Sequence, residues 1–132
     1  MDIKIRRAGE KDISVIYKLV LDATRHGKIL KRSLPDIRQA VHHFWVAEEG
    51  GEVIACCALE TYNKKLAEIR SLAVMSDKRK KGIASSLLAC CLKEAKKKRV
   101  YEVLAITDRE NLFKRLGFSE QLHGQKALFL RP

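Results

Sequence analysis

The feature that most constrains the fold is a succession of four segments between residues 66 and 107. Residues 66–74 are strand-like, residues 75–81 are rich in lysine and arginine, residues 82–99 repeat apolar side chains at helical spacing, and residues 100–107 are again apolar and strand-like. A strand, a helix and a second strand in this order form a crossover whose two strands pair in parallel. The chain is therefore expected to contain a sheet covered by helices.

The remaining chain predicts further elements of the same mixed type. The other strand-like runs are residues 4–7, 44–49, 53–62, 118–121 and 126–130, and the last two are expected to close the sheet as a hairpin. Helices are expected after residue 12, after the capping Ser33 and over residues 111–116. Together these segments predict one α/β (mixed α+β) domain over residues 1–132, with a central mixed sheet of about seven strands and about four helices.

The net charge and the cysteines limit the function classes. The 27 basic and 16 acidic residues give +11, which favours an anionic partner. No apolar run approaches the roughly 20 residues of a membrane span, and the start is unlike a signal peptide, so a cytoplasmic protein is expected. The adjacent pairs Cys56-Cys57 and Cys90-Cys91 match no zinc pattern and are expected to be reduced apolar residues. No metal site is predicted, because His42-His43 has no evident third ligand.

A basic stretch enters the long helix directly. Lys78, Arg79, Lys80 and Lys81 precede Gly82, at the point where the helix is expected to begin. A helix start presents unpaired N–H groups and a partial positive charge, which suit a phosphate, and glycine lets the backbone approach the anion. A solvated basic turn would look the same by itself. The position between a strand and a long helix favours phosphate binding.

Three segments resemble the GNAT acetyltransferases, in the order and at the spacing of that family. Arg79-x-x-Gly82-x-Ala84 is similar to the family's Arg/Gln-x-x-Gly-x-Gly/Ala signature, residues 72–74 look like its splayed strand, and residues 111–118 resemble its closing segment. The resemblance implies acetyl-CoA as cosubstrate, with its pyrophosphate in the glycine loop and its pantetheine arm along the strand. The residues that it assigns to the cofactor are Leu72, Ala73, Val74, Arg79, Lys80, Lys81, Gly82, Ile83, Ala84, Ser85, Asn111 and Phe113.

A narrower resemblance covers most of the chain. Residues 29–33, 46–49 and 67–74 look like the short, single-domain N-acetylglutamate synthase group. This implies acetyl transfer to the α-amine of an amino acid, with glutamate expected. The tail after Phe118 is shorter than that group's, and acceptor contacts often lie there.

Three side chains are candidates for the acceptor site. Glu68 is the candidate base, because an amine must lose a proton before it attacks a thioester, and the family often places a glutamate on this strand. Arg70 shares a sheet face with Glu68 and can bind a carboxylate through two hydrogen bonds. Arg32 is a second, weaker candidate. The alternatives are a strand carboxylate paired with a lysine, and surface arginines.

Other functions remain open at this stage. Phe113 stands where many GNAT enzymes have a proton-donating tyrosine, and the sequence nominates no substitute. The acceptor could be another amine (a protein N-terminus or lysine, a polyamine, a small molecule), although +11 argues against a polycation. A non-catalytic module that binds CoA or nucleic acid is the other class, and the few aromatic residues near the basic clusters argue against nucleic acid. The oligomeric state is open, with a homodimer among the alternatives.

Overall fold

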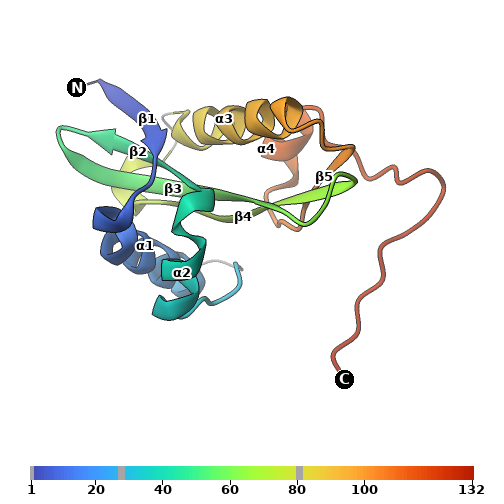
Figure 1. Cartoon of the computed structure of the whole chain (residues 1–132), viewed down its shortest axis with the longest axis horizontal. Helices are drawn as coiled ribbons and strands as arrows, with labels where there is room; N and C mark the ends of the chain where they lie inside the picture. The colour runs from blue at the N-terminus through green and yellow to red at the C-terminus, as the bar shows by residue number, and fades with distance from the viewer. Residues whose placement is uncertain (1, 27–28, 80–81) are drawn as a thin grey trace.

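The computed structural model describes residues 2–26, 29–79 and 82–132, and shows one five-stranded sheet with helices on both faces (Figure 1). The strands lie in the order β1-β2-β3-β4-β5, and only β4 and β5 are parallel. The parallel pair expected from the crossover is thereby confirmed. The elements are β1 (Ile3–Arg7), α1 (Ile13–His26), α2 (Leu34–Ala40), β2 (Phe44–Glu49), β3 (Glu52–Thr61), β4 (Leu66–Val74), α3 (Ile83–Lys97), β5 (Glu102–Ala105) and α4 (Glu110–Arg115), with single turns of 3-10 helix at Glu10–Asp12, Val41–His43 and Ser76–Lys78.

The sheet separates two apolar cores. α3 and α4 cover one face, and α1 and α2 cover the other (Figure 1). Alternation along the strands explains the division, because neighbouring residues of a strand point to opposite faces. In β3, for example, Cys57 and Leu59 belong to the core under α3, whereas Cys56 and Ala58 belong to the core under α1 and α2.

Both helices on the second face start at features visible in the sequence. The Ser33 hydroxyl accepts a hydrogen bond from the Asp36 amide at 3.2 Å, which caps α2 as predicted. Before α1, the buried Asp12 accepts two hydrogen bonds from Arg6, at 2.8 and 2.9 Å, and a third from the Gly9 amide. The guanidinium holds the pKa of Asp12 below its ordinary value. This ion pair ties the start of α1 to β1.

The cysteines are free thiols, as expected. Cys56, Cys57 and Cys91 are buried, and Cys90 is partly buried. Burial raises the pKa of Cys56 to about 12. The Cys57 and Cys91 sulfurs lie 3.9 Å apart, where β3 packs against α3. These side chains act as small apolar groups of the core.

β4 carries an irregularity that positions the site. Cys56 lies opposite Ala73 and Ala58 lies opposite Arg70, so β4 has one residue more than β3 over this stretch. Ser71, inside the bulge, adopts a left-handed conformation with φ +57°. On its other side, β4 pairs with β5 only over residues 66–69. The two parallel strands therefore separate just where the bulge begins.

The predicted count of about seven strands is wrong by two, although the mixed class is confirmed. Residues 118–121 and 126–130 form no strands; a single bridge joins Leu122 to Gln125 around a turn at His123-Gly124. Both turn residues have positive φ, as a hairpin turn requires, but the arms do not continue the pairing. The apolar residues 128–130 are consecutive and exposed, so they would need cover on both faces of a strand, and no described element provides it.

Candidate active site

The separation of β4 from β5 leaves the β5-facing edge of β4 unpaired beyond Ile69 among the described residues, while β3 stays paired on the other edge. β5 is paired only as far as Ile69, whereas β4 continues to Val74. The side chains of Ala73 and Val74 are buried and that of Leu72 packs on the core, so this stretch presents its backbone. These are the residues that the sequence assigned to the pantetheine arm. An extended ligand with amide groups could pair with such an edge as an added strand would.

The end of β4 leads to the start of α3. Gly82 is the residue before α3 and has φ +76°, a left-handed conformation that favours glycine. No side chain of the described residues caps this 15-residue helix, so its first N–H groups, at Ile83, Ala84 and Ser85, are available to an anion. The Arg79 Nε donates to the Val74 carbonyl at 3.5 Å.

The structure describes only two of the four predicted cations of this loop, and one of the two forms an ion pair. The Lys78 ammonium lies 2.7 Å from a Glu49 carboxylate oxygen, which raises the pKa of Lys78. Lys80 and Lys81 lie outside the described residues, so the structure does not place them. Of the two cations of this loop that the structure describes, Arg79 is the exposed one.

The predicted closing segment is α4 with the turn that follows it. Asn111 is exposed in its first turn, and Phe113 is buried with its ring edge-on to Phe118 at 5.1 Å between centroids. The beginning of α4 therefore offers polar groups, whereas Phe113 contributes only apolar surface.

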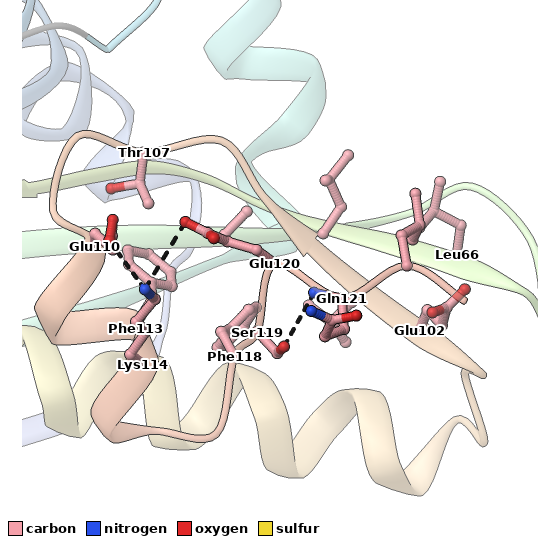
Figure 2. Close-up of a pocket in the computed structure, with 14 residues that line it drawn as sticks. Leu66, Glu102, Thr107, Glu110, Phe113, Lys114, Phe118, Ser119, Glu120 and Gln121 are labelled. Carbon is pink, nitrogen blue, oxygen red and sulfur yellow. Dashed lines mark hydrogen bonds and ion pairs between the residues drawn. The ribbon is translucent and has the colours of Figure 1, made fainter. Parts of the chain in front are cut away.

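A cavity of about 300 Å³ lies between α4, β5 and residues 118–122 (Figure 2). Phe113 and Lys114 line it from α4. None of Glu68, Arg70 and Arg32 lines it, so the candidate acceptor residues lie elsewhere.

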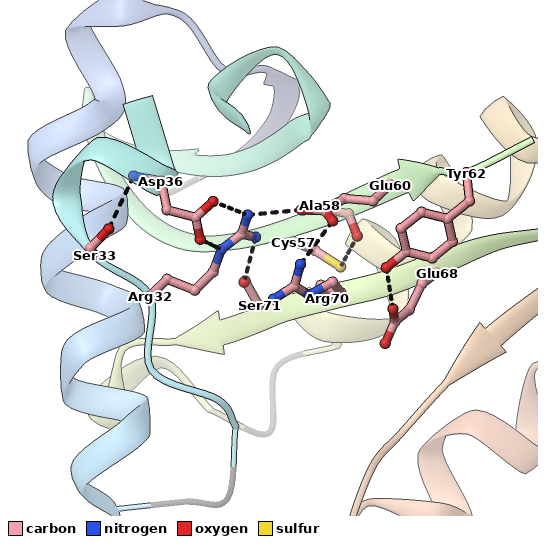
Figure 3. Close-up of polar contacts among 10 residues, drawn as sticks. All are labelled: Arg32, Ser33, Asp36, Cys57, Ala58, Glu60, Tyr62, Glu68, Arg70 and Ser71. Atoms are coloured by element: carbon pink, nitrogen blue, oxygen red, sulfur yellow. Dashed lines mark hydrogen bonds and ion pairs between the residues drawn. The ribbon is translucent and has the colours of Figure 1, made fainter. Parts of the chain in front are cut away.

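The candidate acceptor residues gather on the face that carries α1 and α2 (Figure 3). Glu68 accepts a 2.5 Å hydrogen bond from the hydroxyl of Tyr62. Arg70 donates to Glu60 Oε2 at 2.8 Å, and 28% of its side chain is exposed. Glu68 and Arg70 share one sheet face, as their spacing predicted.

Arg32 lies deeper in the same cluster. Its side chain is 2% exposed and forms ion pairs with Asp36 at 2.7 Å and with Glu60 at 2.8 Å. Its Nη1 also donates to the Ser71 hydroxyl at 3.1 Å, which connects the loop before α2 to the bulge of β4. The guanidinium of Arg32 lowers the pKa of Asp36. Arg32 therefore holds α2, β3 and the bulge of β4 together around the cluster.

Two of the residues that contact the candidate acceptor side chains from β3 and its end were not predicted from the sequence. Glu60 bridges both arginines, and Tyr62 contacts the proposed base. Alternation along β3 and the residue after it puts residues 60 and 62 on one face, but the sequence gives no register between β3 and β4. The observed register, with Glu60 opposite Glu68, is what brings them together.

The arrangement offers no metal centre within the described ranges. No group of three or more histidine, cysteine or acidic residues there could hold a metal ion. In the same part of the chain, no helix is long and apolar enough to cross a membrane.

Known proteins share this architecture. An N-acetyltransferase of Chlorobaculum tepidum is 39% identical over 119 residues, which cover 90% of this chain and 77% of that protein. An amino-acid acetyltransferase of Mycobacterium tuberculosis is 35% identical over 120 residues, 88% of this chain and 68% of that protein. The structure of N-acetylglutamate synthase from Neisseria gonorrhoeae, complexed with coenzyme A and N-acetyl-glutamate, superposes with a TM-score of 0.83 at 27% identity. It covers 90% of this chain, which spans only 28% of that synthase.

The family match includes most of the site. Residues 40–120 match the family described as the acetyltransferase (GNAT) domain. This range contains the bulged β4, the uncapped start of α3 and α4. The chain therefore belongs to the GNAT family and is an acetyl-CoA-dependent N-acetyltransferase.

Proposed function

We propose that the enzyme transfers the acetyl group of acetyl-CoA to the α-amine of an amino acid, with glutamate as the preferred acceptor. The observation that carries the proposal is the placement of Glu68 and Arg70 on one face of β4, next to the point where β5 leaves the edge of β4. A base and a carboxylate-binding cation thus lie side by side where the cofactor edge begins. Two relatives are named for amino-acid acetyltransferase or N-acetylglutamate synthase activity, which supports this acceptor class.

The residues fit the binding of acetyl-CoA in two places. The backbone of Leu72, Ala73 and Val74 would pair with the pantetheine arm, and the start of α3 with Arg79 and Gly82 would hold the pyrophosphate. We assign Lys80, Lys81, Ile83, Ala84, Ser85, Asn111 and Phe113 to the same binding surface. The bound cosubstrate supplies an acetyl group activated as a thioester.

Glu68 has the role of a base in this proposal. An α-ammonium group cannot attack a carbonyl carbon until it loses a proton, and Glu68 accepts that proton directly or through a water molecule. Phe113 has no proton to give to the departing sulfur. A free thiol has a pKa of about 8.5, so a thiolate is a tolerable leaving group near neutral pH.

Arg70 would bind a carboxylate of the acceptor, and Arg32 would support the site by holding Glu60. Arg70 is partly exposed and reaches one oxygen of Glu60, so an acceptor carboxylate can compete with Glu60 for its guanidinium. Arg32 is buried and holds the other oxygen of Glu60. Because Arg32 keeps Glu60 paired, an acceptor carboxylate could take the Arg70 guanidinium without leaving Glu60 alone.

A screen of acceptors by release of CoA thiol tests the proposal. Glutamate is expected to give the highest kcat/KM, aspartate and glutamine lower values, and leucine a value tens of times lower, because leucine lacks the second polar group. Spermidine should be poorer still, since it would add cations to a basic protein. If leucine or spermidine were used better than glutamate, the glutamate assignment would be wrong, and the acetyltransferase class would stand.

A further inference from the structure

Tyr62 occupies a position that the register of β3 and β4 dictates. Glu60 lies opposite Glu68, and the Tyr62 amide donates to the Leu66 carbonyl at 3.0 Å. Tyr62 and Glu68 are therefore diagonal neighbours on one face, a separation that an aromatic side chain can span. The phenol hydroxyl reaches Glu68 Oε1 at 2.5 Å (Figure 3).

The register also creates a conflict that these contacts resolve. Two carboxylates directly opposite each other on neighbouring strands repel, and Glu60 and Glu68 form such a pair. Glu60 turns towards Arg32 and Arg70, whereas Glu68 turns towards Tyr62 (Figure 3). One carboxylate is thus held between two cations, and the other is held by a single neutral donor. Glu68 could therefore accept a proton from the acceptor without first giving up an ion pair.

We propose that Tyr62 is a positioning residue for acetyl transfer, whose hydroxyl aims and stabilises the ionised carboxylate of Glu68. The inference rests on the proposed role of Glu68 as the base.

The surroundings of Tyr62 favour this role over simple packing. Tyr62 is 52% exposed and belongs to neither apolar core, so the fold does not need its ring. Its hydroxyl nevertheless points to Glu68 rather than to solvent. Burial of the hydroxyl, the hydrogen bond to Glu68 and the charges of Glu68 and Glu60 raise the pKa of Tyr62 to about 12, against the opposing effect of Arg70. The phenol therefore remains a protonated donor throughout the pH range in which an enzyme is assayed.

The variant Tyr62→Phe tests the proposal, because it removes one oxygen and keeps the ring. We expect kcat to fall about tenfold with KM for acetyl-CoA unchanged, since a typical hydrogen bond to a charged group corresponds to about that factor. We also expect the acid limb of the kcat/KM–pH profile to move to higher pH, because the ionised carboxylate loses a donor. Tyr101→Phe is the matched control: Tyr101 is 71% exposed and stacks on His123, and its variant should behave like the wild type.

The same experiment separates this inference from the proposed function. Adding Tyr62→Phe to Glu68→Gln should cause no further loss, because the hydroxyl acts only through Glu68. If Glu68→Gln were inactive but Tyr62→Phe kept both the wild-type rate and the wild-type pH profile, the positioning role would be refuted and the base would stand. If Glu68→Gln kept full activity, the proposed base itself would be refuted. A loss in Tyr62→Phe that persisted in the Glu68→Gln background would also overturn the inference.

Discussion

The two stretches of β4 on either side of Ser71 differ in what they present. Before the bulge, Glu68 and Arg70 project side chains whose partners are Tyr62, just after β3, and Glu60, in β3. After it, Ala73 and Val74 bury their side chains and leave backbone at the edge. The acceptor side is thus made of side chains, and the cofactor side is made largely of main chain.

The difference predicts how each side responds to substitution. Ligand binding by main-chain groups is insensitive to most side-chain changes. It is lost when the backbone conformation or the space for the ligand is altered. In a cluster of paired charges, each substitution removes one specific contact and leaves the partner group unpaired. Substitutions at the two sides should therefore separate binding of acetyl-CoA from use of the acceptor.

The largest effect is expected at Gly82. Gly82→Asp adds a negative charge and a side chain where the pyrophosphate would lie, at a residue with φ +76°. Binding of acetyl-CoA, measured by calorimetry on folded protein, should fall by roughly a thousandfold or below detection. Gly124→Asp is the control, because Gly124 has φ +77° in the turn of the C-terminal segment and should leave affinity unchanged. Equal affinities in both variants would contradict a phosphate site at α3.

Glu68→Gln should have the next largest effect, and on the other side of the comparison. The substitution keeps the shape of the side chain and removes its basicity, so kcat should fall about a hundredfold. Affinity for acetyl-CoA should change by less than about twofold, since the cofactor side is untouched. Glu52→Gln, at an exposed position that begins β3, is the control for the loss of one charge. A Glu68→Gln enzyme with an unchanged rate between pH 6 and 9 would exclude the proposed base.

Arg70→Ala should weaken use of the acceptor by tens of times. Loss of a guanidinium–carboxylate contact costs about 2–3 kcal/mol, and it should be seen mostly as a raised KM for glutamate. Steady-state assays at varied glutamate and saturating acetyl-CoA measure it. Arg25→Ala removes an exposed arginine near the end of α1 and controls for net charge. An unchanged KM for glutamate in Arg70→Ala would remove Arg70 from the acceptor site.

The smallest effect on activity is expected from an ion pair of the scaffold. Asp12→Asn breaks the contact with Arg6 and should lower the free energy of unfolding by about 2 kcal/mol at pH 7, with kcat and KM preserved. The pKa of Asp12 is lowered in the folded state, so its contribution is present above the ordinary carboxyl range. That contribution is lost as the pH falls through the lowered pKa. Urea unfolding of both proteins should therefore show a difference at pH 7 that shrinks below about pH 4.

The sequence predicted the elements that local patterns determine. The strand Leu66–Val74, the helix after Gly82 and the capped start at Ser33 depend on spacing and on single residues, and the structure has them. The final hairpin was predicted from apolar runs alone, and Leu128–Leu130 found no surface to pack on. The remaining features of the sheet depend on the pairing and register of strands that are distant in the sequence, and no local sequence pattern indicates these.

The same distinction applies to the candidate site. The glycine loop could be identified because a helix start and its glycine are adjacent in the chain. Glu68 and Arg70 could be placed on one face because they are two residues apart. The pairing of Arg32 with Glu60, across 28 positions, depends on how the loop before α2 packs against β3. That contact could only come from the folded structure.

The buried thiols at the junction of β3 and α3 make cofactor binding measurable without catalysis. Cys57 and Cys91 are fully covered where α3 meets the sheet, so a thiol reagent can modify them only when that junction opens. α3 also carries the proposed phosphate site at its first turn. If opening releases acetyl-CoA, the modification rate should fall by the factor 1 + [acetyl-CoA]/Kd. The dependence of the thiol modification rate on acetyl-CoA concentration would then give the affinity of acetyl-CoA for the start of α3.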